Sequence, residues 1–407
     1  MHTPVKRKVH QAGLIMMMAA LTGCDAGVYQ PAETPPEALR MNAVVDRATA
    51  AERWVALTRT IIGRREFGPL GIARTYALVS VAQYNAVIAA ADGKDHGRHP
   101  SEAGAAAAAA ATVLRAIYPM EGPAIDAQLA SDAVLLPQLP SERSADYAAG
   151  IIVGEQAAVA VLERAATDGS AAIWSGSIPA GPGFWLNGPP PLQPVSPLWG
   201  DVRPWVLESG DQFRPAPPPA FGSAEFIAAL TEVRHYTDNV TPEQLEIARF
   251  WQGGSGPGGP MGYFGAVASG LAASRNMNER AATRMFAVMY MAIMDASIGC
   301  WDAKYAYWYI RPHQADPGIA TPVGRPNFPA YPSAHSCLSA AAVGVLRDFF
   351  PAETANLNAQ VDEAGVARLY AGLHYHFDIT AGQELGFAVA RLALANAPRG
   401  QQAIPLD

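Results

Sequence analysis

Most of this sequence consists of long segments in which apolar residues recur three and four positions apart. In residues 71–91 the side chains of Leu78, Val81, Ala82 and Tyr84 follow this spacing, which places them on one face of an α-helix. No run in the first half of the chain alternates between apolar and polar residues for long enough to predict a β-sheet. Half of the residues are hydrophobic and 16% are charged, so the chain is expected to bury a large core. The same helical pattern occurs in residues 43–63, 105–117, 141–167, 223–236 and 241–251.

One segment interrupts the helical pattern. Between Pro179 and Pro219 lie 12 of the 34 prolines, and proline lacks the backbone N–H that a regular helix needs. Residues 171–222 also contain four of the eight tryptophans. A flexible linker is expected to be poor in tryptophan, so we predict an ordered strap that packs across the helices. The strap separates an N-terminal helical part at residues 41–170 from a C-terminal helical part at residues 223–400.

The first forty residues indicate export and membrane anchoring. Three basic residues at positions 6–8 precede an apolar run at 14–21, which is shorter than the roughly 20 residues that a membrane-spanning helix needs. The run ends in Leu-Thr-Gly-Cys24, which looks like the lipobox of bacterial lipoproteins, where the cysteine receives the lipid. We predict a signal peptide at 1–23 and a flexible tether at 24–40, with the protein anchored in the cell envelope and facing the periplasm or the exterior. The alternative is an ordinary secreted precursor.

The net charge argues against a nucleic-acid partner, and the cysteine content argues against a disulfide scaffold or a CxxC zinc site. The formal net charge is −7, and removal of residues 1–23 leaves 26 bases against 36 acids, a net charge of −10. Such a surface repels the phosphate backbone, so no nucleic-acid partner is expected. The chain has only three cysteines, which are too few for a disulfide scaffold and form no CxxC pair of the kind found in zinc sites.

Two short blocks place charged residues where they can meet an anion. Lys304 and Arg311 are seven residues apart, about two helical turns, so they point from the same face before Pro312 ends the helix. Ser333 stands at the N-cap position of a second predicted helix. Its hydroxyl and the next backbone N–H groups can contact an anion at the positive helix end, and His335 lies in the same first turn.

A third block combines an arginine, a glycine, a histidine and an aspartate. Arg368 and His374 are six residues apart, so on one continuous helix they would point about 120° apart. Gly372 permits a break that lets them converge. His374 and Asp378 are four residues apart, so the carboxylate can hold one ring nitrogen and leave the other free to attack or to act as a ligand.

In this order the three blocks resemble the signature shared by type 2 phosphatidic acid phosphatases and vanadium-dependent haloperoxidases. That signature reads Lys-x6-Arg-Pro, Pro-Ser-Gly-His and Arg-x5-His-x3-Asp, and the chain matches every fixed position but one. Ala334 replaces the glycine and keeps its backbone N–H. Upstream, residues 73–80 and 199–215 look like the bacterial haloperoxidase-type members.

The resemblance implies an all-α fold of packed helical bundles and a role for each residue of the signature. His374 is the implied apical ligand or nucleophile, His335 the acid or base on the opposite side, and Asp378 the residue that orients His374. The groups implied to bind a tetrahedral oxyanion, vanadate or phosphate, are Lys304, Arg311, Ser333, the N–H of Ala334, His335, Arg368 and His374.

Vanadate and phosphate share charge and shape, so the signature leaves two chemistries open. In a haloperoxidase the cofactor is vanadate, with its vanadium bound to His374, and the substrates are hydrogen peroxide and a halide. In a phosphatase there is no cofactor, His374 forms a phosphohistidine with a phosphate ester, and His335 protonates the leaving group. A third alternative is a lipid-anchored binding protein with an inactive site, which the complete set of buried cations argues against. A homodimer is common in this group of proteins.

Two aromatic residues favour the haloperoxidase alternative. Trp301 lies three residues before Lys304, and Phe328 lies five residues before Ser333. Both match aromatic positions near the halide pocket of fungal chloroperoxidases, which implies a halide pocket here. Core packing is the alternative interpretation for Trp301.

Two cysteines lie next to residues that are expected to converge on the oxyanion. Cys300 lies four residues before Lys304, and Cys337 lies two residues after His335. Because both segments must reach one oxyanion, the two residues could form a disulfide in an oxidising compartment. Two buried thiols that fill core space are the equally open alternative.

The predicted lipid anchor gives a direct test. Expression with labelled palmitate should label the wild-type protein, and the Cys24→Ala variant should lose the label because the only thiol of the motif is gone. A wild-type protein that is unlabelled and freely soluble would contradict the lipoprotein prediction.

Overall fold

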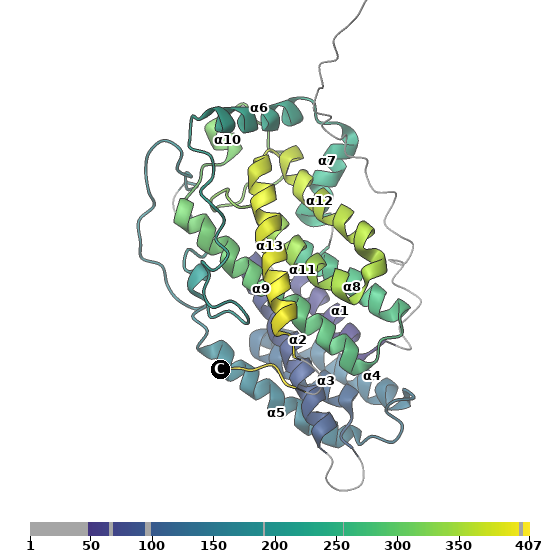
Figure 1. Cartoon of the computed structure of the whole chain (residues 1–407). Helices are drawn as coiled ribbons and strands as arrows, with labels where there is room; N and C mark the ends of the chain where they lie inside the picture. The colour runs from purple at the N-terminus through teal and green to yellow at the C-terminus, as the bar shows by residue number, and fades with distance from the viewer. Residues whose placement is uncertain (1–47, 65–67, 94–98, 190–191, 255, 399–401) are drawn as a thin grey trace, which may run out of the picture. The chain divides into compact units, whose positions relative to one another are not determined.

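Helices provide the regular structure in the part of the chain that is described. The computed structural model describes residues 48–64, 68–93, 99–189, 192–254, 256–398 and 402–407, and all of them lie in one compact unit (Figure 1). Within these ranges there are thirteen α-helices and no β-strand, so the all-α prediction is confirmed. The predicted signal peptide, Cys24 and the tether lie outside the described residues.

The helices are separated by loops and a few single helical turns. The α-helices are α1 (Ala50–Gly63), α2 (Pro69–Asp92), α3 (Glu102–Ile117), α4 (Gly122–Leu135), α5 (Tyr147–Ala166), α6 (Ala224–Asp238), α7 (Pro242–Arg249), α8 (Pro260–Ser274), α9 (Glu279–Tyr307), α10 (Pro312–Ala315), α11 (Ala334–Phe349), α12 (Thr354–Tyr370) and α13 (His376–Asn396). The short turns are η3 (Pro119–Glu121), η4 (Leu136–Gln138), η5 (Trp199–Asp201), the π-helix η6 (Phe250–Gly254) and η7 (Pro351–Glu353).

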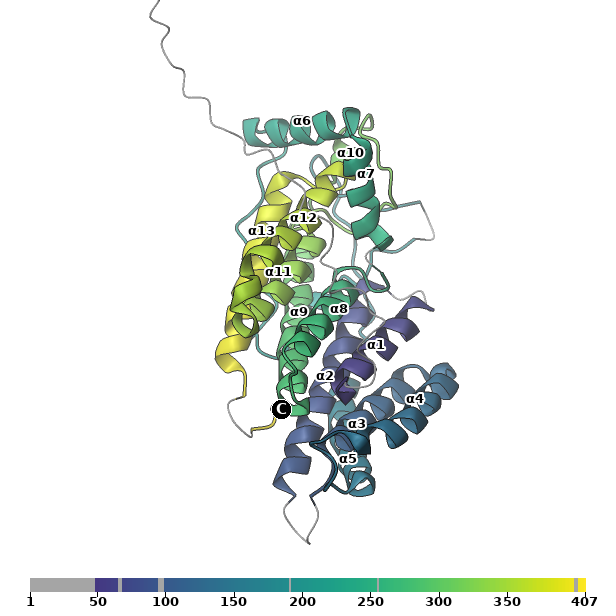
Figure 2. The ribbon, with the colours of Figure 1, turned by 90° about the vertical axis from the view of Figure 1, so that its right-hand side faces the viewer.

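The N-terminal helices form one end of the bundle around α3. All seven alanines of the run Ala105–Ala111 are buried, because α3 packs against both α2 and α5 (Figure 1). Alanine is the best helix former and its small side chain allows close approach, which explains why this low-complexity segment is a core helix. Figures 1 and 2 show α6, α7 and α10 at the opposite end of the bundle.

Helix α9 connects the two helical parts. It packs against α2 on one side and against α11 and α13 on the other (Figure 2). Of the described helices, α9 alone is long and apolar enough to cross a bilayer, but 89% of its apolar window is buried inside the protein. This burial is typical of the core helix of a soluble domain.

Helices α11 and α13 lie in direct contact, which positions the candidate site. A Cβ built on Gly382 of α13 would lie 2.7 Å from the carbonyl oxygen of Ser333, and one built on Gly386 would lie 2.2 Å from that of Cys337. Only glycine fits such a close approach. The start of α13 is thereby held against the start of α11, where the Ser333 N–H donates to the Asp378 carbonyl at 2.9 Å.

A buried carboxylate of α9 holds the Pro- and Trp-rich strap. Asp295 is fully buried and accepts the backbone N–H groups of Trp205, Val206 and Leu207 at 2.7–3.0 Å. The Arg164 guanidinium stacks over the Trp205 ring at 3.8 Å. The strap is therefore ordered where it crosses α9, as its tryptophan content indicates.

Loss of this carboxylate should release the strap. We expect Asp295→Ala to cost roughly 3 kcal/mol of unfolding free energy, because one buried and two partly buried N–H groups lose their acceptor. Limited proteolysis should then cut near residues 203–215, and urea unfolding measures the loss. The matched control is Asp302→Ala, which removes a partly exposed ion pair with Arg214 and should cost at most about 1 kcal/mol. Equal protease resistance of wild type and Asp295→Ala would contradict this anchor.

Candidate functional site

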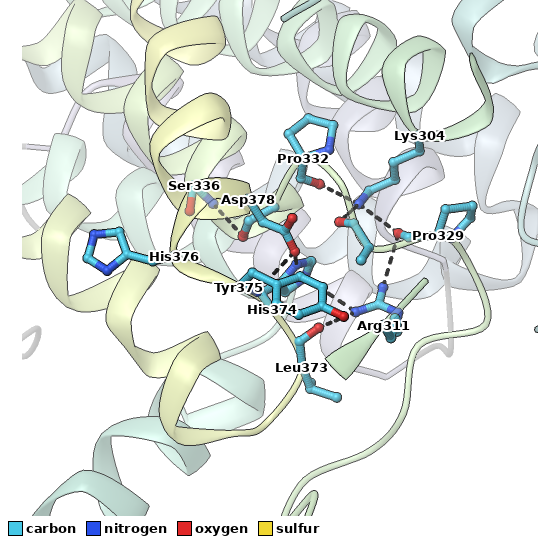
Figure 3. A network of polar contacts seen from close by, with 12 residues as sticks. Lys304, Arg311, Pro329, Pro332, Ser336, Leu373, His374, Tyr375, His376 and Asp378 are labelled. Carbon is cyan, nitrogen blue, oxygen red and sulfur yellow. Dashed lines mark hydrogen bonds and ion pairs between the residues drawn. The ribbon is translucent and has the colours of Figure 1, made fainter. Parts of the chain in front are cut away.

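The three blocks identified in the sequence meet where the ends of five helices come together. Figure 3 shows Lys304, Arg311 and the His374–Asp378 pair pointing toward one another, whereas His376 points away. The residues come from the last turn of α9 (Lys304), the N-cap of α10 (Arg311), the N-cap and first turn of α11 (Ser333, Ala334, His335), the last turn of α12 (Arg368), the loop after α12 (His374) and the first turn of α13 (Asp378).

The predicted break between Arg368 and His374 is confirmed. Helix α12 ends at Tyr370, and Gly372 follows with φ = +67°, in the left-handed region that other residues rarely adopt. A side chain there would also meet the Ala320 carbonyl oxygen at 2.4 Å. The reversal of the chain brings His374 back to the end of α12 that carries Arg368.

His374 is buried and held in one orientation. Its Nδ1 lies 2.9 Å from Oδ2 of Asp378, and both residues are at most 2% exposed. The carboxylate accepts the Nδ1–H, so the lone pair of the neutral ring is on Nε2, which lies 3.4 Å from Nη1 of Arg311. Burial, followed by the charges of Arg311, Lys304 and Arg368, lowers the pKa of His374 well below its usual value. The ring therefore presents an unprotonated Nε2 to the cations.

Lys304 is tied to the loop that precedes α11. Its ammonium donates to the carbonyl oxygens of Pro329 at 3.0 Å and Ala330 at 2.8 Å, and also to that of Pro332. These three contacts use all three donors of the ammonium. Lys304 thus fixes the turn that carries Ser333, and a contact with a bound anion would replace one of the carbonyls.

Arg311 braces the same loop from the other side. Its Nε donates to the Phe328 carbonyl oxygen at 2.9 Å, and its Nη2 donates to that of Pro329 at 3.3 Å. Its Nη1 donates to the Leu373 carbonyl oxygen at 2.9 Å, next to His374. Arg311 therefore links the loop before α11 to the loop before α13.

Arg368 differs from the other two cations because it keeps free donors. It is 1% exposed, and its Nη2 donates to Oε1 of Gln252 at 3.0 Å. Its Nε and Nη1 are buried with no hydrogen-bond partner among the described residues. A buried guanidinium with two unpartnered donor nitrogens is costly, and a tetrahedral oxyanion accepts hydrogen bonds from such nitrogens in pairs.

Burial makes the three cations easier to deprotonate than they are in water, but it leaves them charged near neutral pH. Desolvation is the main cause in each case, and it lowers the pKa of Lys304 to about 8, that of Arg368 to about 9 and that of Arg311 to about 10. Burial raises the pKa of Asp378 to about 7, against the opposing effects of Lys304, the Tyr375 N–H and Arg311. The site therefore carries excess positive charge.

His335 lies in the first turn of α11 and is tied to Trp251, which the sequence pattern predicts only as the end of a helix. Its Nε2 lies 2.9 Å from the backbone carbonyl oxygen of Trp251. A carbonyl only accepts, so Nε2 carries the hydrogen and Nδ1 carries the lone pair. Desolvation of the ring, followed by the charge of Arg368, lowers its pKa well below the usual value. His335 is thus a neutral proton acceptor.

Ser333 and Ala334 provide the helix end in this cluster. Ser333 is fully buried and its side chain accepts the Ser336 N–H at 3.5 Å as the N-cap of α11. Ala334 is the first residue of α11, where backbone N–H groups have no acceptor within the helix. The positive end of α11 therefore adds to the charge of the three cations.

The two aromatic residues expected at a halide pocket lie together beside the cations. Their ring centroids are 5.0 Å apart. Phe328 is partly exposed, and the centroid of its ring lies 5.2 Å from Nζ of Lys304 and 5.0 Å from Cζ of Arg311. Trp301 is fully buried and donates its Nε1–H to the Val195 carbonyl oxygen in the strap at 3.1 Å. Phe328 thus borders the site, and Trp301 packs behind it.

Cys300 and Cys337 are free thiols. Both are fully buried, and they lie close enough for each thiol to shift the pKa of the other. Cys300 Sγ also lies 3.8 Å from the Pro332 carbonyl oxygen that Lys304 contacts. The sequence left a disulfide and two packed thiols open as alternatives. The structure shows the two packed thiols.

Comparison with known proteins agrees with this geometry. Residues 283–401 match the model of the PAP2 superfamily, and this range contains the cluster from Lys304 to Asp378. A bacterial vanadium-dependent iodoperoxidase has a TM-score of 0.74 at 24% identity, with 86% of this chain and 97% of that chain covered.

Two further solved structures are similar over most of their length. A holo-type bacterial vanadium-dependent chloroperoxidase has a TM-score of 0.65 at 14% identity, covering 80% of this chain and 92% of that one. An apo-type bacterial vanadium-dependent chloroperoxidase has a TM-score of 0.68 at 13% identity, covering 86% and 98%. None of the curated proteins compared with the chain matches it. The chain therefore has the fold of these haloperoxidases, as the resemblance in sequence implies.

Anion binding should weaken as the pH rises. As the pH rises, Asp378, with a pKa of about 7, becomes negatively charged first, and Lys304, with a pKa of about 8, then loses its positive charge, so both changes disfavour an anion. Titration calorimetry with sulfate, whose charge is constant between pH 6 and 9, should show this decrease. In the Lys304→Met variant, the decrease in sulfate affinity near pH 8 should disappear, and the decrease near pH 7 should remain. A wild-type affinity that is independent of pH would contradict the assignment.

Proposed function

We propose that this protein is a vanadate-dependent haloperoxidase-like enzyme that oxidises a halide with hydrogen peroxide. The observation that carries the proposal is that two buried donor nitrogens of Arg368 have no partner among the described residues, close to a neutral histidine whose Nε2 is unprotonated. Among the described residues, no cluster of three His, Cys, Asp or Glu side chains could hold a metal ion. One imidazole surrounded by cationic donors suits an oxyanion.

The residues present fit vanadate. His374 Nε2 would bind the vanadium, while Arg368, Arg311 and the helix end at Ser333 and Ala334 would hold the oxygens. When bound, vanadate supplies a Lewis-acidic centre that activates hydrogen peroxide toward a halide. Asp378 keeps the Nδ1–H of His374 in place, so that Nε2 stays available.

His335 would move a proton in this reaction. Its Nδ1 lone pair is unprotonated near neutral pH, so it can accept a proton from an incoming peroxide. Lys304 holds the loop before α11 and adds positive charge beside the site. Phe328, which borders the two cations, would form an apolar wall for the halide.

A phosphatase is the second candidate, because residues 283–401 match the PAP2 superfamily. In that reaction His374 Nε2 would attack phosphorus, and His335 would have to protonate the leaving group. The lowered pKa of His335 suits a base better than an acid near neutral pH. This observation, together with the similarity in fold to haloperoxidases over 86% of the chain, favours halide oxidation.

The setting of the enzyme is also proposed. The signal sequence and Cys24 support export and anchoring in the cell envelope, where peroxide and halide are small enough to diffuse to the site. A homodimer is proposed from the resemblance alone.

The activity can be tested on purified protein with and without orthovanadate. We expect peroxide-dependent oxidation of iodide or bromide only after orthovanadate is added. The His374→Ala variant should lose this activity by several orders of magnitude, because it removes the imidazole nitrogen that would bind the vanadium. The matched control is His376→Ala, two residues away, which removes an exposed histidine bonded to Glu232 and should keep wild-type activity.

The opposite result has a clear form. Hydrolysis of nitrophenyl phosphate that orthovanadate inhibits, without any halide oxidation, would show the phosphatase instead. Halide oxidation that survives in His374→Ala would place the reaction elsewhere in the protein.

A further inference from the structure

The π-helix η6 (Phe250–Gly254) touches the site at two points. The Trp251 carbonyl oxygen accepts the Nε2–H of His335 at 2.9 Å, and Oε1 of Gln252 accepts an Nη2–H of Arg368 at 3.0 Å. Consecutive residues of one turn therefore hold the neutral base and the arginine with free donors. Short π-helical turns occur frequently at functional sites because they re-aim neighbouring groups.

The Gln252 amide that accepts the hydrogen bond from Arg368 carries no charge. Among the described residues, Arg368 forms no ion pair with a carboxylate, and its pKa is lowered by burial and by the neighbouring charge of Arg311. Asp378, the carboxylate within the cluster, is engaged by His374 and by the Tyr375 N–H. Counted formally, the three buried cations Lys304, Arg311 and Arg368 against the one carboxylate of Asp378 give the cluster a charge of +2.

We propose that Gln252 is a specificity-determining and positioning residue that makes the site select doubly charged tetrahedral anions over singly charged ones. Its amide oxygen orients the guanidinium of Arg368 without neutralising it, so the full charge of Arg368 remains for the ligand. A dianion, such as a phosphate monoester or vanadate in its doubly charged form, matches a charge of +2 and meets the free Nε–H and Nη1–H. The inference rests on the proposed oxyanion-binding function.

The position of Gln252 makes the proposal testable by substitution. Gln252 is exposed, whereas Arg368 is 1% exposed, so the amide lies where the buried cluster meets solvent. A glutamate of the same length could pair with Arg368 and lower the charge of the site by one. An alanine would remove the hydrogen bond without changing the charge.

The readout is the ratio of two affinities measured by titration calorimetry at pH 7. Sulfate is a tetrahedral dianion and methanesulfonate a tetrahedral monoanion, and neither changes charge near this pH. We expect Gln252→Glu to weaken sulfate binding roughly tenfold or more, and methanesulfonate binding by about the square root of that factor, because Coulomb energy scales with ligand charge. Gln252→Ala should weaken both by the same factor, and Gln252→Lys should raise the ratio of sulfate to methanesulfonate affinity.

Each outcome separates this inference from the proposed function. Equal losses for both anions in Gln252→Glu, with an unchanged ratio in Gln252→Lys, would leave an oxyanion site but overturn the charge selection. A wild-type protein that binds neither anion would overturn both the oxyanion site and this inference. Melting temperatures without anion show whether each variant is folded, and the Lys and Glu variants test the same ratio with opposite expected signs.

Discussion

The burial of three cations inside an all-helical body is the constraint on which the site depends. Lys304, Arg311 and Arg368 are at most 1% exposed, and taking such charges out of water is costly unless other groups replace the lost solvent. The carbonyl oxygens of the loop at 328–332 do this for Lys304 and Arg311. On Arg368, the donor atoms Nε and Nη1 have no partner among the described residues. These two nitrogens are therefore available to bind an anion.

Packing between helices turns this constraint into a defined geometry. Gly382 and Gly386 let α13 lie directly on α11, so that Asp378 and Ser333 meet. Gly372 reverses the chain between α12 and α13 and brings His374 toward the cations. These contacts belong to helix ends, where backbone groups and side chains are free to bind a ligand while the helices behind them stay rigid.

Two chemistries are proposed for the same cluster because vanadate and phosphate have similar shape and charge. The protonation state of His335 separates the two proposals, since its ring is neutral and donates its Nε2–H to the Trp251 carbonyl. A neutral base suits proton transfer from peroxide, whereas a leaving group in phosphate hydrolysis requires an acid. The π-helix that provides this carbonyl also provides Gln252, so one short turn influences both proton transfer and the charge of the site.

The helical periodicity of the sequence determined the all-α fold, and the spacing of the three blocks indicated the cationic residues, His335, the His374–Asp378 pair and the break at Gly372. These features are local, because helix phase and capping follow from residues a few positions apart. The sequence did not indicate Gln252 or the Trp251 carbonyl, since both reach the site from a π-helix more than eighty residues before His335. It also left open whether Cys300 and Cys337 form a disulfide. Only tertiary packing decided these points, because contacts between distant segments depend on how the helices pack and not on the spacing within any one of them.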